Sequence, residues 1–181
     1  NQYLAMAGDT DATMSAEIRF VRALHYFLLM DGWGNIPFTL EPMTKPEQRS
    51  RAQMYEWLEQ ELIGIEPALS EAKAKKSTDA GYGRVDKAAC WLLLSRLYLN
   101  SEIYTGTAQW QKAKEYADKV IKSSYRLNTV GKGGWTAYQM LFMGDNGETD
   151  AAYEALLPLL QDGLTTTSWG TSLSVSYTHL R

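Results

Sequence analysis

The chain has 181 residues, of which 45% are hydrophobic and 22% are charged, and its net charge is −3. This length and apolar content suit one folded domain, or one domain with a piece of another, and they exclude wholesale disorder. The mildly acidic balance gives no general attraction to phosphate, so we expect no nucleic-acid partner. A single cysteine excludes an internal disulfide framework and an all-cysteine metal site.

The sequence shows neither the pattern of a signal peptide nor that of a membrane span. The sequence begins at Asn1 without the basic and apolar regions of a signal peptide. No run of about 18 apolar residues occurs. We interpret the chain as a fragment or processed form of a longer protein, in which any address signal would precede Asn1.

Two helices are predicted in the first part of the chain. The first covers residues 15–31, where two apolar rows predict a helix that is buried on most sides. An extended loop with three prolines follows at 35–49. The second helix covers residues 50–71 and begins with Ser50 and Gln53, which have the spacing of a capping box.

A second pair of helices follows a polar loop at 72–83. One helix is predicted over residues 86–101, and its stretch 88–94 is apolar on all sides, which predicts a central helix packed on every side. A second, amphipathic helix is predicted over residues 108–124. The small and aromatic residues of this pair are spaced as in a tetratricopeptide helix pair. The first pair does not repeat the pattern at a period of about 34 residues, so we predict a degenerate helical repeat.

The character of the chain changes after Tyr125. Glycine-rich loops at 128–150 surround a short amphipathic piece. Residues 161–177 are rich in Thr and Ser, and Leu173, Val175 and Tyr177 alternate with serines as in a strand. We therefore predict a mainly α fold, with tetratricopeptide-like helical hairpins in 1–127. An irregular, loop-rich part with little β structure follows in 128–181 and belongs to the same, incomplete fold.

Three stretches in this order are distinctive. They are residues 16–37 (AEIRFVRA through YF to GNIP), 83–100 (GRVDKAA through LSRLYLN) and 110–121 (WQKA with YADKVI). Together they resemble the SusD/RagB family, the glycan-binding outer-membrane lipoproteins of Bacteroidetes, over roughly residues 13–170. The chain would correspond to an interior part of a longer family member.

The resemblance implies a noncatalytic surface lipoprotein that captures oligosaccharides for nutrient uptake. Such a protein sits as a lid on a TonB-dependent transporter of the SusC type, with its helices packed against the transporter. It is held by a lipid at the outer face of the outer membrane. Two features depart from the family: the lipid-bearing N-terminal cysteine is absent from this chain, and the residues from about Val175 to Arg181 do not match.

Aromatic side chains in loops are the candidates for sugar binding, because the apolar faces of pyranose rings stack on aromatic rings. Trp135, which follows two glycines, and Trp169, which follows a Thr/Ser run, lie in predicted loops. We predict both as substrate-binding residues, with half-buried packing as the alternative for each. The other tryptophans are predicted to be core residues: Trp33, Trp57, Trp91 and Trp110.

The sequence contains an acidic loop, but no pattern that predicts a metal site. Asp145, Glu148 and Asp150 offer oxygen ligands of the kind that calcium prefers. Their spacing does not match an EF-hand, and a solvated turn is the simpler interpretation. We predict no metal and no cofactor.

We also predict no catalytic residue. Cys90 lies in an apolar run, where a thiol has a raised pKa and is inert. His25 is expected on a buried helix face, and His179 lies in the part that departs from the family. Three arginines on otherwise apolar helices, Arg19, Arg22 and Arg96, are expected to form buried ion pairs with Glu17, Asp31 or Glu61.

Two other classes of function remain open. A helical-repeat adaptor would bind a protein or peptide in a groove along its helices and would have no affinity for sugar. A glycosidase would need two carboxyl groups roughly 5–9 Å apart across a cleft. We rank glycan binding first, the adaptor second and the enzyme last.

Overall fold

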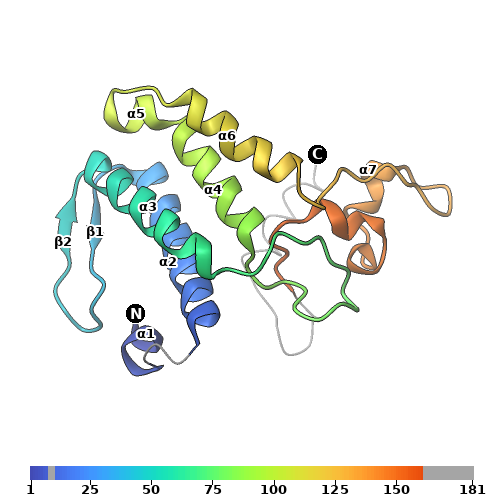
Figure 1. Ribbon diagram of the computed structural model, residues 1–181, viewed down its shortest axis with the longest axis horizontal. Coiled ribbons are helices and arrows are strands. Elements are labelled where there is room, and N and C mark those ends of the chain that lie inside the picture. Colours follow the sequence, from blue (N-terminus) through green and yellow to red (C-terminus); the bar gives the residue numbers. More distant parts are fainter. Residues whose placement is uncertain (8–10, 161–181) are drawn as a thin grey trace, which may run out of the picture.

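The computed structural model describes residues 1–7 and 11–160 of the protein, and these residues form a mainly helical fold (Figure 1). The helices are α1 (Gln2–Ala7), α2 (Ala12–Trp33), α3 (Arg51–Ile65), α4 (Lys87–Leu99), α5 (Ser101–Thr105), α6 (Trp110–Ile121) and α7 (Ala137–Met140). The described part also contains the 3₁₀ turns η1 (Glu66–Ala68), η2 (Asn146–Glu148) and η3 (Asp150–Glu154). The predicted fold class is confirmed. None of the described helices is both long and apolar enough to cross a membrane.

Two helical hairpins make up the helical part. α2 packs against α3, α4 packs against α6, and contacts between α3 and α4 join the two pairs. β1 (Ile36–Phe38) and β2 (Glu47–Arg49) form an antiparallel pair in which Ile36 lies opposite Arg49, within the segment predicted to be extended. Figure 1 shows this pair at one end of the molecule and the loop-rich part around α7 at the other.

Side-chain caps fix where the main helices begin. The Asp11 carboxylate accepts a hydrogen bond from the Met14 amide at the start of α2. The predicted capping box of α3 is confirmed, since the Ser50 hydroxyl accepts from the Gln53 amide and the Gln53 side chain accepts from the Ser50 amide. The helix predicted to reach residue 71 ends at Ile65, because the chain then enters the 3₁₀ turn η1 with a proline in its first turn.

Asp86 joins the helical part to the loop-rich part. Its carboxylate is buried and caps α4 by accepting hydrogen bonds from the amides of Ala88 and Ala89, at 2.8 and 3.2 Å. The other carboxylate oxygen accepts from the Lys73 amide at 3.1 Å and from the Tyr125 hydroxyl at 2.8 Å. One side chain therefore fixes the start of α4, the polar loop before it and the chain that leaves α6.

The core lies between the two hairpins. Its largest fully buried side chains are Phe20, Phe27, Met30, Ile36, Met54, Leu58, Leu62, Ile65, Cys90, Leu94, Leu97 and Tyr98. They come from one face each of α2 and α3, from β1 and from most of α4. α4 therefore contributes more of these side chains than a single face would. The prediction that it is packed on every side is wrong, because Leu92 and Leu99 of α4 are exposed.

Two predictions about α2 are wrong. The apolar row that contains Val21, His25 and Leu28 is exposed, so α2 is buried on one face and not on most sides. The His25 ring nitrogen Nδ1 lies 2.7 Å from the Val21 carbonyl oxygen of its own helix, so this histidine is not in the core. The physical reason is the layer structure, because only one side of α2 faces α3 and α4.

Two tryptophans that were predicted to be core residues lie at the surface. Trp33 is 75% exposed at the end of α2, and Trp110 is 61% exposed at the start of α6. Within α6 only Ala113 is fully buried, because this helix lies at the edge of the bundle and packs chiefly against α4. Trp57, in contrast, packs against the core as predicted.

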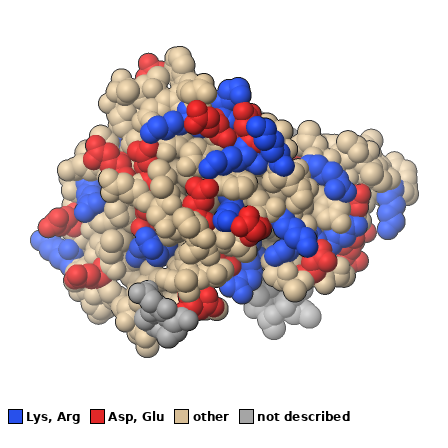
Figure 2. All heavy atoms as spheres, in the orientation of Figure 1, with Lys and Arg blue, Asp and Glu red and all other residues tan. Residues whose placement is uncertain are grey.

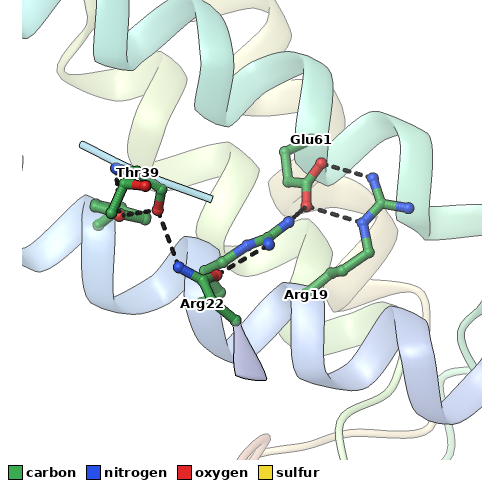
Figure 3. Close-up of polar contacts among 6 residues, drawn as sticks. Arg19, Arg22, Thr39 and Glu61 are labelled. Atoms are coloured by element: carbon green, nitrogen blue, oxygen red, sulfur yellow. Dashed lines mark hydrogen bonds and ion pairs between the residues drawn. The ribbon is translucent and has the colours of Figure 1, made fainter. Parts of the chain in front are cut away.

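The predicted buried ion pair at Glu61 is confirmed (Figure 3). Glu61 of α3 accepts two hydrogen bonds from Arg19, at 2.9 and 2.6 Å, and one from Arg22 at 2.7 Å. Burial raises the pKa of the Glu61 carboxyl, but the hydrogen bonds from the two arginines outweigh it, and the net pKa lies below its usual value of 4.5. These bonds tie α2 to α3 across the first hairpin.

The other predicted ion-pair partners are used differently. Among the described residues Arg96 forms no ion pair, and its guanidinium lies over the ring of Phe27, 5.4 Å from the ring centroid. Glu17 pairs instead with Arg84, at 2.7 Å, and the Asp31 carboxylate accepts from the Tyr104 hydroxyl at 2.6 Å. The expected pairing of Arg96 is therefore wrong, because an aromatic ring, and not a carboxylate, lies beneath its guanidinium.

Two similar polar clusters, here called the rungs, bridge α3 and α6 over α4. In the first rung, the Tyr98 hydroxyl and the Lys112 ammonium donate to the same oxygen of Glu59, at 2.8 and 3.0 Å. In the second, Trp91 Nε1 and Lys119 donate to one oxygen of Glu66, at 2.7 and 3.2 Å. Each residue of one rung lies seven positions, or about two helical turns, from its counterpart in the other. Figure 2 shows basic and acidic side chains interleaved along this α6 side of the molecule.

Candidate functional site

The loop-rich end is assembled from two segments that are distant in sequence. The Ser77 amide donates to the Gly147 carbonyl at 2.7 Å, and the Arg126 amide donates to the Tyr153 carbonyl at 3.1 Å. The Ala74 amide donates to the Ser124 hydroxyl at 2.7 Å. The loop between α3 and α4 is thus bonded to the chain on both sides of α7, which gives this end a defined shape.

A cavity of about 790 Å³ lies in this end of the molecule. Its lining combines one aromatic ring, hydroxyl and amide groups, two glutamates and small or apolar residues. These residues are Ser77, Tyr82, Leu141, Gly144, Asn146, Gly147, Glu148, Ala151, Ala152, Glu154, Ala155, Pro158, Leu159 and Leu160. The volume and the mixture of apolar surface with a few polar groups are typical of a site for a small organic ligand such as a short oligosaccharide.

Charge near the cavity is neutralised by a salt-bridge cluster. The Asp150 carboxylate lies 2.9 Å from Lys76 Nζ and 3.5 Å from an Arg126 nitrogen. The hydrogen bond from Lys76 holds the pKa of the Asp150 carboxyl below its usual value, and the same bond raises the pKa of Lys76. Burial raises the pKa of the Tyr82 hydroxyl, so this phenol stays neutral and able to donate a hydrogen bond.

The acidic loop considered for calcium is used for these ion pairs. Asp150 is the member of that loop that faces Lys76 and Arg126. Across residues 1–7 and 11–160, no three His, Cys, Asp or Glu side chains gather in a way that could hold a metal ion. The structure therefore offers nothing in support of the calcium hypothesis within this range.

Trp135, one of the two predicted sugar-binding residues, lies in a tight turn before α7. Its amide donates to the Lys132 carbonyl at 3.0 Å, and the Lys132 amide donates back to the Trp135 carbonyl at 3.1 Å. Gly133 and Gly134 between them have φ of +62° and +86°, a region that favours glycine. The Trp135 side chain is 52% exposed, so its ring is accessible at the surface. Trp169, the other candidate, lies outside the described residues.

The residues after Trp135 present two further aromatic rings that were not predicted as candidates. Tyr138 and Phe142 are 70% and 72% exposed, and their ring centroids lie 5.2 Å apart in an edge-to-face arrangement. The sequence signal was available, since the two residues are four positions apart and share a face of a short helix. It was weak, because such a pair usually packs inward, whereas here Met140 fills the buried side of α7.

Cys90 is buried as predicted. Desolvation, with a smaller contribution from the charge of Glu66, raises the pKa of its thiol to about 12. A thiol in this environment is a packing residue and not a nucleophile.

Comparison with known proteins identifies the fold and the family. No family model matches the chain. The starch-binding protein SusD of Bacteroides thetaiotaomicron is 42% identical to it over 170 residues, which are 91% of this chain and 29% of SusD. The surface glycan-binding protein A from Bacteroides uniformis is 30% identical, with a TM-score of 0.56, over 71% of this chain and 29% of that protein.

A laminarin-binding SusD-like protein has a TM-score of 0.67 at 22% identity, over 90% of this chain and 34% of its own. The fold, helical hairpins with a loop-rich end, thus places this chain in the class of SusD-like proteins. The chain belongs to the SusD/RagB family, as its three motifs indicated. It spans about a third or less of the length of these relatives.

Proposed function

We propose that this chain is part of a noncatalytic glycan-binding protein that serves nutrient uptake. The observation that carries the proposal is the 42% identity to the starch-binding protein SusD over 91% of the chain. In the whole protein we propose a lipid anchor at the outer face of the outer membrane and a TonB-dependent transporter of the SusC type as partner.

Two features of the loop-rich end support sugar binding. Trp135 presents a half-exposed indole on which the apolar face of a pyranose can stack. The cavity in the same loop-rich end offers hydroxyl, amide and carboxylate groups that can bond to sugar hydroxyls. We propose that residues 1–127 form the helical frame, and that residues 128–181 contribute sugar contacts through Trp135 and Trp169.

The electrostatics of the described residues support a noncatalytic role. A general acid that works near neutral pH needs a carboxyl group whose pKa is raised. The carboxyl groups with a resolved shift, Glu61, Asp118 and Asp150, all have a lowered pKa because each accepts hydrogen bonds from basic side chains. These groups are suited to holding the scaffold together and not to donating protons.

The outer face of α2 supports the contact with the transporter. A groove of about 530 Å³ runs along it, lined largely by the apolar side chains Ile18, Val21, Leu29, Pro37 and Pro46. Exposed apolar surface of this kind marks interaction sites. The adaptor alternative would need a groove along the helices. Between α3 and α6 the two rungs place side chains of this chain itself, which does not favour that alternative.

Affinity electrophoresis tests the proposal. The chain is run in native gels that contain soluble starch or laminarin, the ligands named for two of its relatives. We expect retardation by at least one polysaccharide and a clear loss of retardation in Trp135→Ala. Trp110→Ala is the matched control, because Trp110 is a similarly exposed tryptophan on α6. A wild-type chain that is retarded by neither glucan, nor by a wider panel of polysaccharides, contradicts glycan binding.

A further inference from the structure

The α7 segment carries an exposed aromatic pair to which the proposed function assigns no role. Tyr138 and Phe142 project from a helix of four residues and its following turn, and both rings are mostly exposed. Their centroids are 5.2 Å apart with an interplanar angle of 65°. One ring therefore supports the other from its edge and leaves aromatic faces open to solvent.

The backbone that carries this pair is fixed by hydrogen bonds on both sides. The capping box formed by Thr136 and Gln139 fixes the start of α7. The Asn128 side-chain amide donates to the Ala137 carbonyl, and the Asn146 side-chain amide donates to the Leu141 carbonyl, both at 2.8 Å. Aromatic side chains have few rotatable bonds and lose little conformational entropy when they bind a ligand. A pair of them on a fixed backbone is therefore well suited to ligand binding.

The surroundings of the pair indicate the charge of its ligand. No Asp, Glu, Lys or Arg occurs from Gly133 to Gly144, which includes Trp135 and all of α7. Figure 2 shows the corresponding surface mostly in tan, with the charged atoms around it. A surface that combines aromatic faces with uncharged amides and hydroxyls is complementary to a neutral molecule that has both apolar and hydroxylated faces.

We propose that Tyr138 and Phe142 form a second stacking site for a neutral oligosaccharide, a few residues along the chain from Trp135. This inference rests on the proposed glycan binding and extends it to two residues outside the loop that holds Trp135. The occupant is a pyranose unit whose C–H face lies on a ring and whose hydroxyls reach the amide of Gln139. The site adjoins the cavity, since Leu141 between the two aromatic residues lines it.

The test compares Tyr138→Ala, Phe142→Ala and the double variant in gels that contain soluble starch or laminarin. We expect each single variant to weaken binding severalfold and the double variant to weaken it about tenfold or more, in line with the effect of removing stacked aromatic rings elsewhere. Tyr138→Phe keeps the ring and should bind within about twofold of the wild type. Thermal unfolding followed by circular dichroism checks that the variants remain folded.

The outcomes separate this inference from the proposal on which it rests. Unchanged binding by the double variant, with binding lost in Trp135→Ala, overturns the second site and leaves glycan binding intact. A double variant with a lowered melting temperature and unchanged binding assigns the pair to packing and also overturns the inference. A wild-type chain that binds neither glucan removes both proposals together.

Discussion

Leu160 lies directly on Gly83. A Cβ atom built on Gly83 would approach Leu160 Cδ1 to 2.8 Å, and Gly83 has φ of +78°, a conformation that other residues adopt at a cost. The contact joins the loop before α4 to the last described residues of the chain. It also closes one side of the cavity, which Leu160 lines.

We predict that Gly83→Ala destabilises the chain by about 1–3 kcal/mol, because an alanine is strained at the positive φ of this position. The half-exposed side chain of Leu160 can shift away from the added methyl group and contributes little to this cost. Urea unfolding measures the change. Gly64→Ala is the control: Gly64 lies in α3 with no atom within 4 Å of the added Cβ, and its substitution should stabilise by about 0.5–1 kcal/mol. Equal effects of the two substitutions would contradict the positive φ at Gly83.

The rungs predict that loss of the hydroxyl group lowers the unfolding free energy by different amounts at two tyrosines that are in ring contact. The ring centroids of Tyr98 and Tyr116 lie 5.6 Å apart. Only the Tyr98 hydroxyl donates a hydrogen bond to a carboxylate, that of Glu59. Tyr98→Phe removes a largely buried hydrogen bond to a charged group and should destabilise by about 1–2 kcal/mol. Tyr116→Phe removes a hydroxyl with no hydrogen bond among the described residues and should change stability by less than about 0.5 kcal/mol. Thermal or urea unfolding of the two variants side by side tests the difference.

The local features of the fold were predictable from the sequence, whereas the exposure of its surfaces was not. The capping box at Ser50 and Gln53 and the pairing of Arg22 with Glu61 follow from local spacing and from the cost of burying a lone charge. The exposure of Trp33 and Trp110 depends on which helix faces find a neighbour. A single sequence holds that information only indirectly, because an apolar row is the same whether or not another element covers it.

The candidate site shows the same contrast between local features, which the sequence predicts, and contacts between distant segments, which it does not. Glycines before Trp135 signalled a turn, and the structure places the indole at the surface there. The cavity could not be predicted, because it forms where the loop around Ser77 meets the chain around Gly147, seventy residues later. Such contacts between distant loops leave no periodic pattern in the sequence.

Cys90 should be unreactive in the folded chain. Its thiol is buried, and its pKa of about 12 leaves almost no thiolate at neutral pH. We predict that iodoacetamide labels Cys90 only as fast as the chain unfolds, so that labelling becomes rapid in concentrated urea. Mass spectrometry of the intact chain over time measures the rate. Rapid labelling without denaturant, in a chain that circular dichroism shows to be folded, would mean that α4 is not covered as described.

Removal of the Glu61 charge should be costly. Glu61→Gln leaves the guanidinium groups of Arg19 and Arg22 without their carboxylate, one of them largely buried. We expect a loss of about 2–3 kcal/mol, less than for a fully buried pair because Arg19 is partly exposed. Urea unfolding at neutral pH gives the value. Lys114→Gln is the control, since its ion pair with Asp118 lies on the surface of α6, where solvent screens it, and should contribute little to stability.

The same carboxylate predicts a pH dependence with a definite sign. The pKa of Glu61 is lower in the folded chain than its usual value of 4.5, so the unfolded chain binds a proton more readily. The stabilisation by Glu61 is therefore fully present above about pH 4.5 and is lost as the pH falls through the folded-state pKa. The difference in unfolding free energy between wild type and Glu61→Gln should be largest at neutral pH and should shrink as the solution is acidified below pH 4.5. Because Asp118 and Asp150 titrate in both proteins, the difference isolates Glu61. A difference that stays constant from neutral pH to strongly acidic pH would show that the arginines do not stabilise the charged form of this carboxyl.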